Sequence, residues 1–248
     1  MKLTRVDCDF YTNSERGPGT YLACNPARSP GALVMAGSTV VKSGISGQIA
    51  CRLCLNRFFT SVFDCFDKPE SIEASNSDQF NSEVLRAAFK GANKGVYEYS
   101  HKLAATGQML ATLFGVVVQD GMVTSGRVGA WSGYLVRAGR IFPFFENPAD
   151  ERSAHFGESL VGAQPKITVE TASWPLEGGD QLIVFSRQLS PEHEIALGEE
   201  CAQGNLGSCA ELAEALFFVG EEPAVGFMAA FGPEAVYLKP QEKSYGAV

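Results

Sequence analysis

Two consecutive stretches with the periodicity of long amphipathic helices constrain this fold most strongly. The first begins near Gln48, and its apolar residues recur at helical spacing: Ile49, Leu53, Phe59, Val62 and Phe63. The second runs from about Asp78 to His101, with Asn76 or Ser77 as its N-cap. Its apolar face is formed by Phe80, Val84, Leu85, Ala88, Ala92 and Val96. Two such helices need a broad apolar surface to cover, which a β-sheet provides.

After Thr106 the chain changes to short apolar segments separated by turns. Asp120-Gly121 and Ala138-Gly139 are typical of tight hairpins between antiparallel strands. The expected strands are 2–10, 20–24, 32–36, 109–118, 122–128, 133–137, 140–145, 167–171, 181–186, 225–231 and 235–238. A small-residue loop is expected over 37–47 and a further helical region over 191–218. The order of elements predicts an α+β domain in which helices cover antiparallel sheets.

Composition narrows the function classes. A chain of 248 residues, 45% of them hydrophobic, favours one domain over 1–240 with a polar tail over 241–248. A formal net charge of −8 argues against nucleic-acid binding, which needs clustered Lys and Arg. No apolar run reaches the roughly 18–20 residues that span a bilayer. Because the first ten residues also lack an apolar signal core, we expect a cytoplasmic protein without a membrane partner.

The seven cysteines are odd in number and scattered, which is not typical of a disulfide framework. Cys51 and Cys54 form a Cys-x-x-Cys pair, but no second pair completes a zinc set. We interpret them as core residues, with a metal or redox site as the alternative.

Several segments, in this order, match motifs of one enzyme family. Residues 37–39 and 46–50 are similar to an Asp-Gly-x-Gly-Gly loop and the helix start that follows it. Residues 106–110 resemble a Gly-Thr-Thr segment before a long strand, and 128–137 a Gly-Asp-Ser-Arg-x-Tyr-Leu hairpin. Residues 179–188 resemble a Gly-Asp-x-Leu-Leu-Leu-Cys-Ser-Asp-Gly strand, and 223–226 a closing Asp-Asn-x-Thr strand. The chain therefore resembles the PPM-type metal-dependent Ser/Thr protein phosphatases. This resemblance implies a four-layer α-β-β-α sandwich with antiparallel sheets.

The departures from the family pattern concern its metal ligands. Family members bind two divalent cations, which need carboxylate oxygens and activate a bridging water. Here no Asp or Glu occurs from Arg16 to Phe63, a span that covers the first two metal motifs. The positions that the resemblance aligns with metal-site residues are Gly37, Ser38, Thr39, Ala130, Arg187, Pro223 and Ala224. We therefore expect neither a metal nor another cofactor.

Two residues beside the expected metal site differ most from the family in chemistry. Arg187 places a guanidinium where the family has a metal-facing carboxylate. It would repel a divalent metal and offer an anion site, or else point to solvent from a loop. Trp131 replaces a small residue, and would either fill the vacated cleft or, if exposed, anchor a partner.

These observations predict a pseudophosphatase: an inactive phosphatase-like domain that acts as a binding module or scaffold in signalling or assembly. Its expected partner is a protein, with a kinase or a phosphoprotein as candidates. One alternative is a divergent hydrolase, either metal-independent or with a site rebuilt from Glu221 and Glu222. Another is a structural subunit that forms homo-oligomers, with Ile141–Phe145 as a candidate contact surface.

Overall fold

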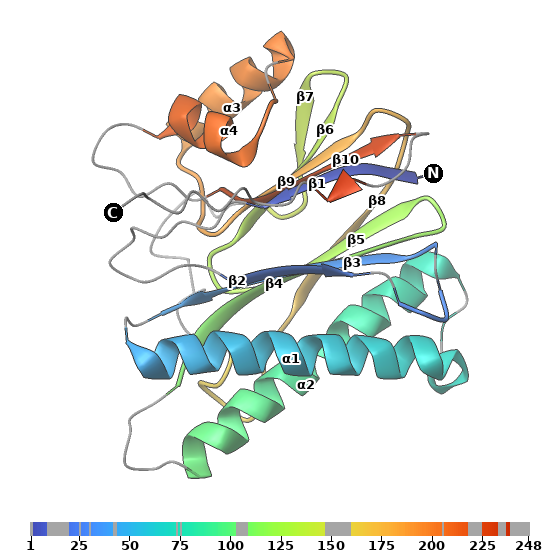
Figure 1. The fold of residues 1–248 in the computed structure, drawn as a ribbon, viewed down its shortest axis with the longest axis vertical. Coiled ribbons are helices and arrows are strands. Elements are labelled where there is room, and N and C mark those ends of the chain that lie inside the picture. The colour runs from blue at the N-terminus through green and yellow to red at the C-terminus, as the bar shows by residue number, and fades with distance from the viewer. Residues whose placement is uncertain are drawn as a thin grey trace, which may run out of the picture.

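The two predicted helices form one outer layer of the computed structural model (Figure 1). Helix α1 spans Ile45–Asp67 and helix α2 spans Ser77–Lys102, with a short 3-10 turn, η1 (Pro69–Ser71), between them. Asn76 is the N-cap of α2, since its side-chain oxygen accepts from the Gln79 amide at 2.8 Å. The structure describes residues 2–8, 20–24, 26–29, 31–41, 44–72, 74, 76–102, 109–146, 160–204, 206–217, 225–232 and 237–238.

Two sheets stack between this layer and a second helical layer, which confirms the expected four-layer α-β-β-α sandwich (Figure 1). The five-stranded sheet has the order β2 (Thr20–Cys24), β3 (Leu33–Val40), β4 (Ala111–Gln119), β5 (Met122–Val128), β8 (Glu170–Pro175). The six-stranded sheet has the order β11 (Tyr237–Leu238), β1 (Lys2–Cys8), β10 (Val225–Gly232), β9 (Gln181–Phe185), β6 (Ser132–Arg137), β7 (Arg140–Pro143). Helices α3 (Pro191–Gln203) and α4 (Cys209–Leu216) cover its outer face. Neighbouring strands are antiparallel except β1 and β11.

The hairpin turns form where the sequence predicts them. Asp120 and Gly121 have φ values of 50° and 73°, and Ala138 and Gly139 have 48° and 73°. Positive φ at both central residues is the signature of the type I′ turn, whose twist matches that of antiparallel strands. The first turn joins β4 to β5, and the second joins β6 to β7.

An ion pair at Asp180 fixes the neighbouring strands β6 and β9. Asp180 is 1% exposed and accepts from Arg137 at 2.9 and 2.7 Å, a bidentate contact. Hydrogen bonding to Asp180 raises the pKa of Arg137 above its ordinary value. The second Asp180 oxygen also accepts from the Glu177 amide at 2.8 Å, so this carboxylate caps the turn before β9.

The sequence prediction differs from the structure in several places. Residues 37–40 continue β3 instead of opening a loop, because β4 pairs with the strand as far as Val40 and β2 as far as Ser38. The strand predicted at 167–171 is β8, displaced to Glu170–Pro175. Ile49 and Phe63 were expected on the buried face of α1, yet each is 37% exposed. Phe144 and Phe145 pack between the sheets, so the segment 141–145 offers little of the contact surface expected of it.

No described helix is both long and apolar enough to cross a membrane.

A glycine pair lets the helices approach the five-stranded sheet closely. Gly115 of β4 and Gly126 of β5 are cross-strand partners on the face beneath the helices. A Cβ atom on Gly115 would lie 2.5 Å from the Phe58 ring of α1, and one on Gly126 would lie 2.9 Å from the Phe89 ring of α2. The two rings meet edge to face with centroids 5.5 Å apart.

Gly115→Ala should therefore lower the free energy of unfolding by roughly 1–3 kcal/mol, because Phe58 must leave its packed position. The matched control is Gly178→Ala, since a Cβ there meets nothing within 4 Å. Urea denaturation of both variants measures the difference. Equal stability of the two would contradict the close packing.

Candidate functional site

A polar cluster lies at the end of the sandwich to which the resemblance assigns the family's metal site. Thr39 of β3 and Thr112 of β4 are cross-strand neighbours, and their hydroxyls hydrogen-bond at 2.6 Å. The indole nitrogen of Trp131 donates to the Thr112 hydroxyl at 2.8 Å. Ser38 donates to the Thr112 backbone carbonyl at 2.8 Å. We call these four residues the threonine–tryptophan cluster; every side-chain group in it is neutral.

Trp131 lies in the connection by which the chain passes from β5 of one sheet to β6 of the other. Its side chain is 0% exposed and packs against Phe114, with ring centroids 5.8 Å apart. The indole therefore fills the space between the sheets, the first of the two alternatives predicted for it, and the other alternative, an exposed partner contact, is wrong. The neighbouring Ala130, in contrast, is exposed and brings only a methyl group.

Arg127 of β5, which is not among the predicted site residues, secures this connection. Its side chain is 4% exposed, and its Nε donates to a Glu170 carboxylate oxygen of β8 at 2.8 Å. One guanidinium nitrogen donates to the Trp131 carbonyl at 2.8 Å, and another to the Glu146 carbonyl at 3.4 Å. The guanidinium also lies 4.5 Å from the centre of the Phe145 ring. A buried, paired cation thus lies at the edge of the cluster.

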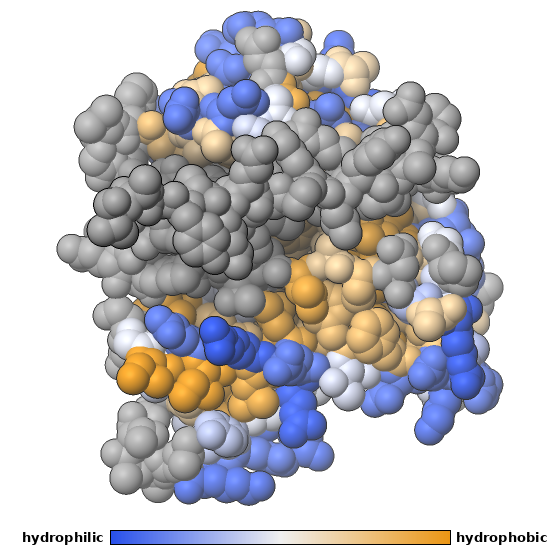
Figure 2. All heavy atoms as spheres, in the orientation of Figure 1, coloured by the Kyte–Doolittle hydropathy of each residue, from blue (hydrophilic) through white to orange (hydrophobic). Residues whose placement is uncertain are grey.

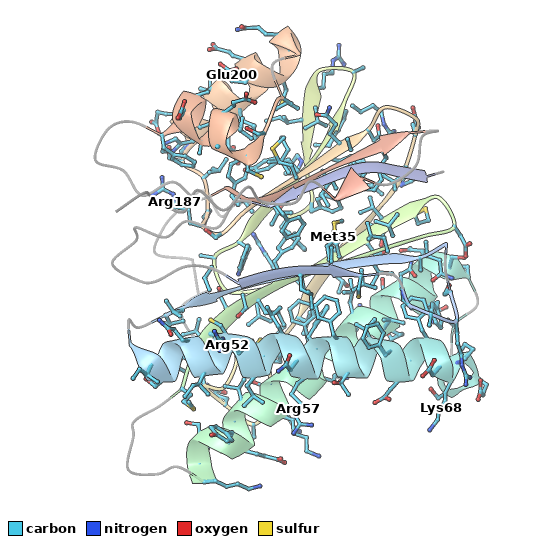
Figure 3. The ribbon with its side chains drawn as sticks, viewed as in Figure 1. Met35, Arg52, Arg57, Lys68, Arg187 and Glu200 are labelled. Atoms are coloured by element: carbon cyan, nitrogen blue, oxygen red, sulfur yellow. The ribbon has the colours of Figure 1, made fainter. Side chains whose placement is uncertain are left out.

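Arg187 lies at the same edge of the sandwich, on the segment that leads from β9 to α3 (Figure 3). It is half-buried, and its guanidinium lies 4.8 Å from the centre of the Phe217 ring after α4. Within the described ranges it forms no ion pair, unlike Arg127. Arg187 is therefore a cation at this end of the molecule whose charge is available to an anion.

The start of α3 combines a serine and a histidine but has the geometry of a helix cap. The Ser190 hydroxyl lies 2.8 Å from His193 Nδ1 and accepts from the His193 amide at 3.4 Å. Ser190 is the N-cap, and Glu192 and Glu194 occupy the first turn, where acidic residues are favourable. The remaining aligned positions, Pro223 and Ala224, lie outside the described residues, as do Glu221, Glu222 and the tail over 241–248.

The Cys51 and Cys54 pair faces the core between α1 and β3. Both thiols are buried, at 1% and 0% exposure, and Ser38 hydrogen-bonds to them. Burial raises the pKa of Cys51 to about 11 and raises that of Cys54 further. Because thiols bind metals and react as thiolates, these two cysteines behave as core residues at neutral pH.

Comparison with solved structures shows a phosphatase-like fold of the PPM class. Bacterial Ser/Thr phosphatases are among the structures that share it. The Mycobacterium tuberculosis phosphatase PstP matches with a TM-score of 0.56 and 16% identity, over 86% of this chain and 98% of that one. The S. agalactiae serine/threonine phosphatase matches with a TM-score of 0.62 and 14% identity, over 93% of this chain and 98% of that one.

PppA, a regulatory component of T6SS in Pseudomonas aeruginosa, gives a TM-score of 0.61 and 14% identity, over 92% of this chain and 99% of that one. Neither a protein-family model nor a curated protein matches the sequence, so structure alone carries this likeness. With identities of 14–16%, this likeness shows the fold alone.

PstP, a phosphatase of this class, has been solved with two manganese ions. The described residues at this end of the present molecule do not fit such ions. Divalent manganese and magnesium need several carboxylate or water oxygens. The threonine–tryptophan cluster instead supplies hydroxyls that already bond to one another and to the indole. Glu170 pairs with Arg127, and the described part of the chain contains no group of three His, Cys, Asp or Glu arranged to hold an ion.

Loss of the charge at Arg127 and at Arg187 should change the stability of the protein by different amounts. Arg127→Met should lower the free energy of unfolding by roughly 1–3 kcal/mol, because the Trp131 carbonyl loses a hydrogen-bond donor in a buried position. Arg187→Met should cost less than about 1 kcal/mol, since it removes only the contact with Phe217. Denaturant titration measures both, and equal costs would contradict the distinct roles assigned to them.

Proposed function

We propose that this protein is a pseudophosphatase: a phosphatase-like domain that binds a protein partner and does not hydrolyse phosphate. The observation that carries the proposal is the hydrogen-bonded threonine–tryptophan cluster where the class holds its metals. Hydrolysis of the class type needs a metal-bound water. The sequence supports the same conclusion, because no carboxylate occurs from Arg16 to Phe63.

Binding of a phosphorylated partner is supported by Arg187. A guanidinium recognises phosphate through paired, charge-assisted hydrogen bonds. Arg187 is half-buried, rests on Phe217 and has no anionic partner among the described residues. Its side chain is thus held in place at modest entropic cost and retains its donors for a ligand.

The proposed setting is a cytoplasmic signalling or assembly pathway, with a phosphoprotein or a kinase as partner. PppA, which shares the fold, is itself described as regulatory. Six cysteines are free thiols, which suits a reducing compartment: Cys24, Cys51, Cys54, Cys65, Cys201 and Cys209.

Fluorescence-labelled phosphopeptides and their unphosphorylated counterparts, incubated with the protein and manganese, test both the binding of phosphate and the absence of hydrolysis. We expect the phosphorylated forms to bind more tightly and to be recovered intact. Arg187→Gln should weaken that binding roughly tenfold, equivalent to about 1.4 kcal/mol. The matched control Arg140→Gln removes an exposed guanidinium from the β6–β7 turn and should leave binding unchanged.

Phosphate release by the purified protein, at a rate that depends on manganese, would contradict the noncatalytic function. The S. agalactiae serine/threonine phosphatase, assayed in parallel, shows that the assay detects turnover. Equal binding of phosphorylated and unphosphorylated peptides would instead contradict the role of Arg187 and leave the noncatalytic function standing.

A further inference from the structure

The solvent face of α1 carries apolar side chains that no described element covers. Ile45 is 77% exposed, and Ile49 and Phe63 are each 37% exposed. Intervals of 4 and 14 residues place all three on one side of a helix with 3.6 residues per turn. Figure 2 shows hydrophobic side chains gathered over the end of α1 drawn at the left of Figure 1. Ile45 and Ile49 lie one turn apart and form an exposed apolar patch, which marks a contact surface, whereas Phe63 lies roughly 27 Å from Ile45 along the helix.

The charge beside Ile45 and Ile49 is positive. From Gly44 to Phe63 the charged residues are Arg52 and Arg57, both exposed, whereas Asp64 and Asp67 lie near the far end of α1. Arg52 follows Ile45 and Ile49 at helical spacing and forms no ion pair with any described residue. A partner of this face should therefore combine an apolar centre with acidic flanks.

The chain itself contains such a surface on α3. Ile195 is 65% exposed, and Glu192 and Glu199, three residues before and four after it, are exposed on the same side of the helix. The sequence from Gln188 to Leu238 contains nine Glu and no Lys or Arg. The α3 face thus complements the α1 face in both polarity and charge.

The two faces lie on opposite outer layers of the sandwich. Figure 3 shows Arg52 and Arg57 on α1 and Glu200 on α3, with both sheets between them. One copy cannot join its own two faces, and a contact between two copies leaves one face free at each end. Such a head-to-tail contact extends into an open chain, or into a ring if its rotation closes.

We propose that a second copy of this protein is the occupant of the α1 face, bound through its α3 face. Ile45 and Ile49 pack against Ile195 of the next copy, and Arg52 pairs with Glu192 and Glu199. The net charge of −8 opposes association only weakly at physiological salt, where the Debye length is about 8 Å. A contact between two helices buries less than the roughly 1,200 Å² of a standard interface, so the association is weak and concentration-dependent.

Sedimentation velocity of two charge reversals tests this contact. Arg52→Glu and Glu199→Arg should each weaken self-association at least tenfold, because each places like charges across the contact. An equimolar mixture of the two variants should associate again, since each altered face then meets the oppositely altered one. Lys94→Glu on α2 changes the net charge as Arg52→Glu does and should leave association unchanged. Circular dichroism verifies that all variants are folded.

Three outcomes would overturn the proposal. The first is a wild-type protein that stays monomeric up to near-millimolar concentration. The second is a mixture that associates no better than its separate components. The third is loss of association with Arg52→Glu but not with Glu199→Arg, which would indicate that two α1 faces meet instead.

Discussion

The hydrogen bond from the Trp131 indole to the Thr112 hydroxyl is the contact on which this end of the molecule depends. Trp131 stands where the chain leaves one sheet for the other, and its ring is fully buried between them. A buried indole N–H without an acceptor would cost about 1–3 kcal/mol, so Thr112 is as necessary as the ring itself. Arg127 completes the arrangement by binding the Trp131 carbonyl and linking β5 to Glu170 of β8. Neutral hydrogen bonds and one ion pair thus hold the region where related folds hold metal ions.

Much of the fold follows from the sequence because local signals determine it. The helices α1 and α2, the two type I′ turns and the Asp180 turn each depend on residues close together in the chain. The extension of β3 through Val40 could not be predicted in the same way. Gly37, Ser38 and Thr39 are typical of a loop, and they form a strand here because β4 pairs with all three and β2 with the first two. Tertiary pairing therefore overrode local preference.

The sequence indicates which carboxylates of the family pattern are missing, but it does not indicate which side chains lie together in their place. The absence of carboxylates is a property of the sequence, whereas the partnership of Thr39, Thr112 and Trp131 arises from strand register. Arg187 was predicted as a site residue from its aligned position, yet the cation buried beside the cluster is Arg127. Alternation along β5 places Arg127 on the side of Val123, which faces the other sheet, and that pattern was the available signal. The exposure of Ile49 and Phe63 likewise depends on which side of α1 meets the sheet.

Anomalous X-ray scattering from crystals grown with manganese tests directly whether this end of the molecule binds the metal. We expect no manganese peak at the threonine–tryptophan cluster, with the Trp131–Thr112 hydrogen bond intact in the same density. A manganese ion bound between Thr39, Thr112 and Ala130, with Trp131 displaced from the space between the sheets, would contradict it.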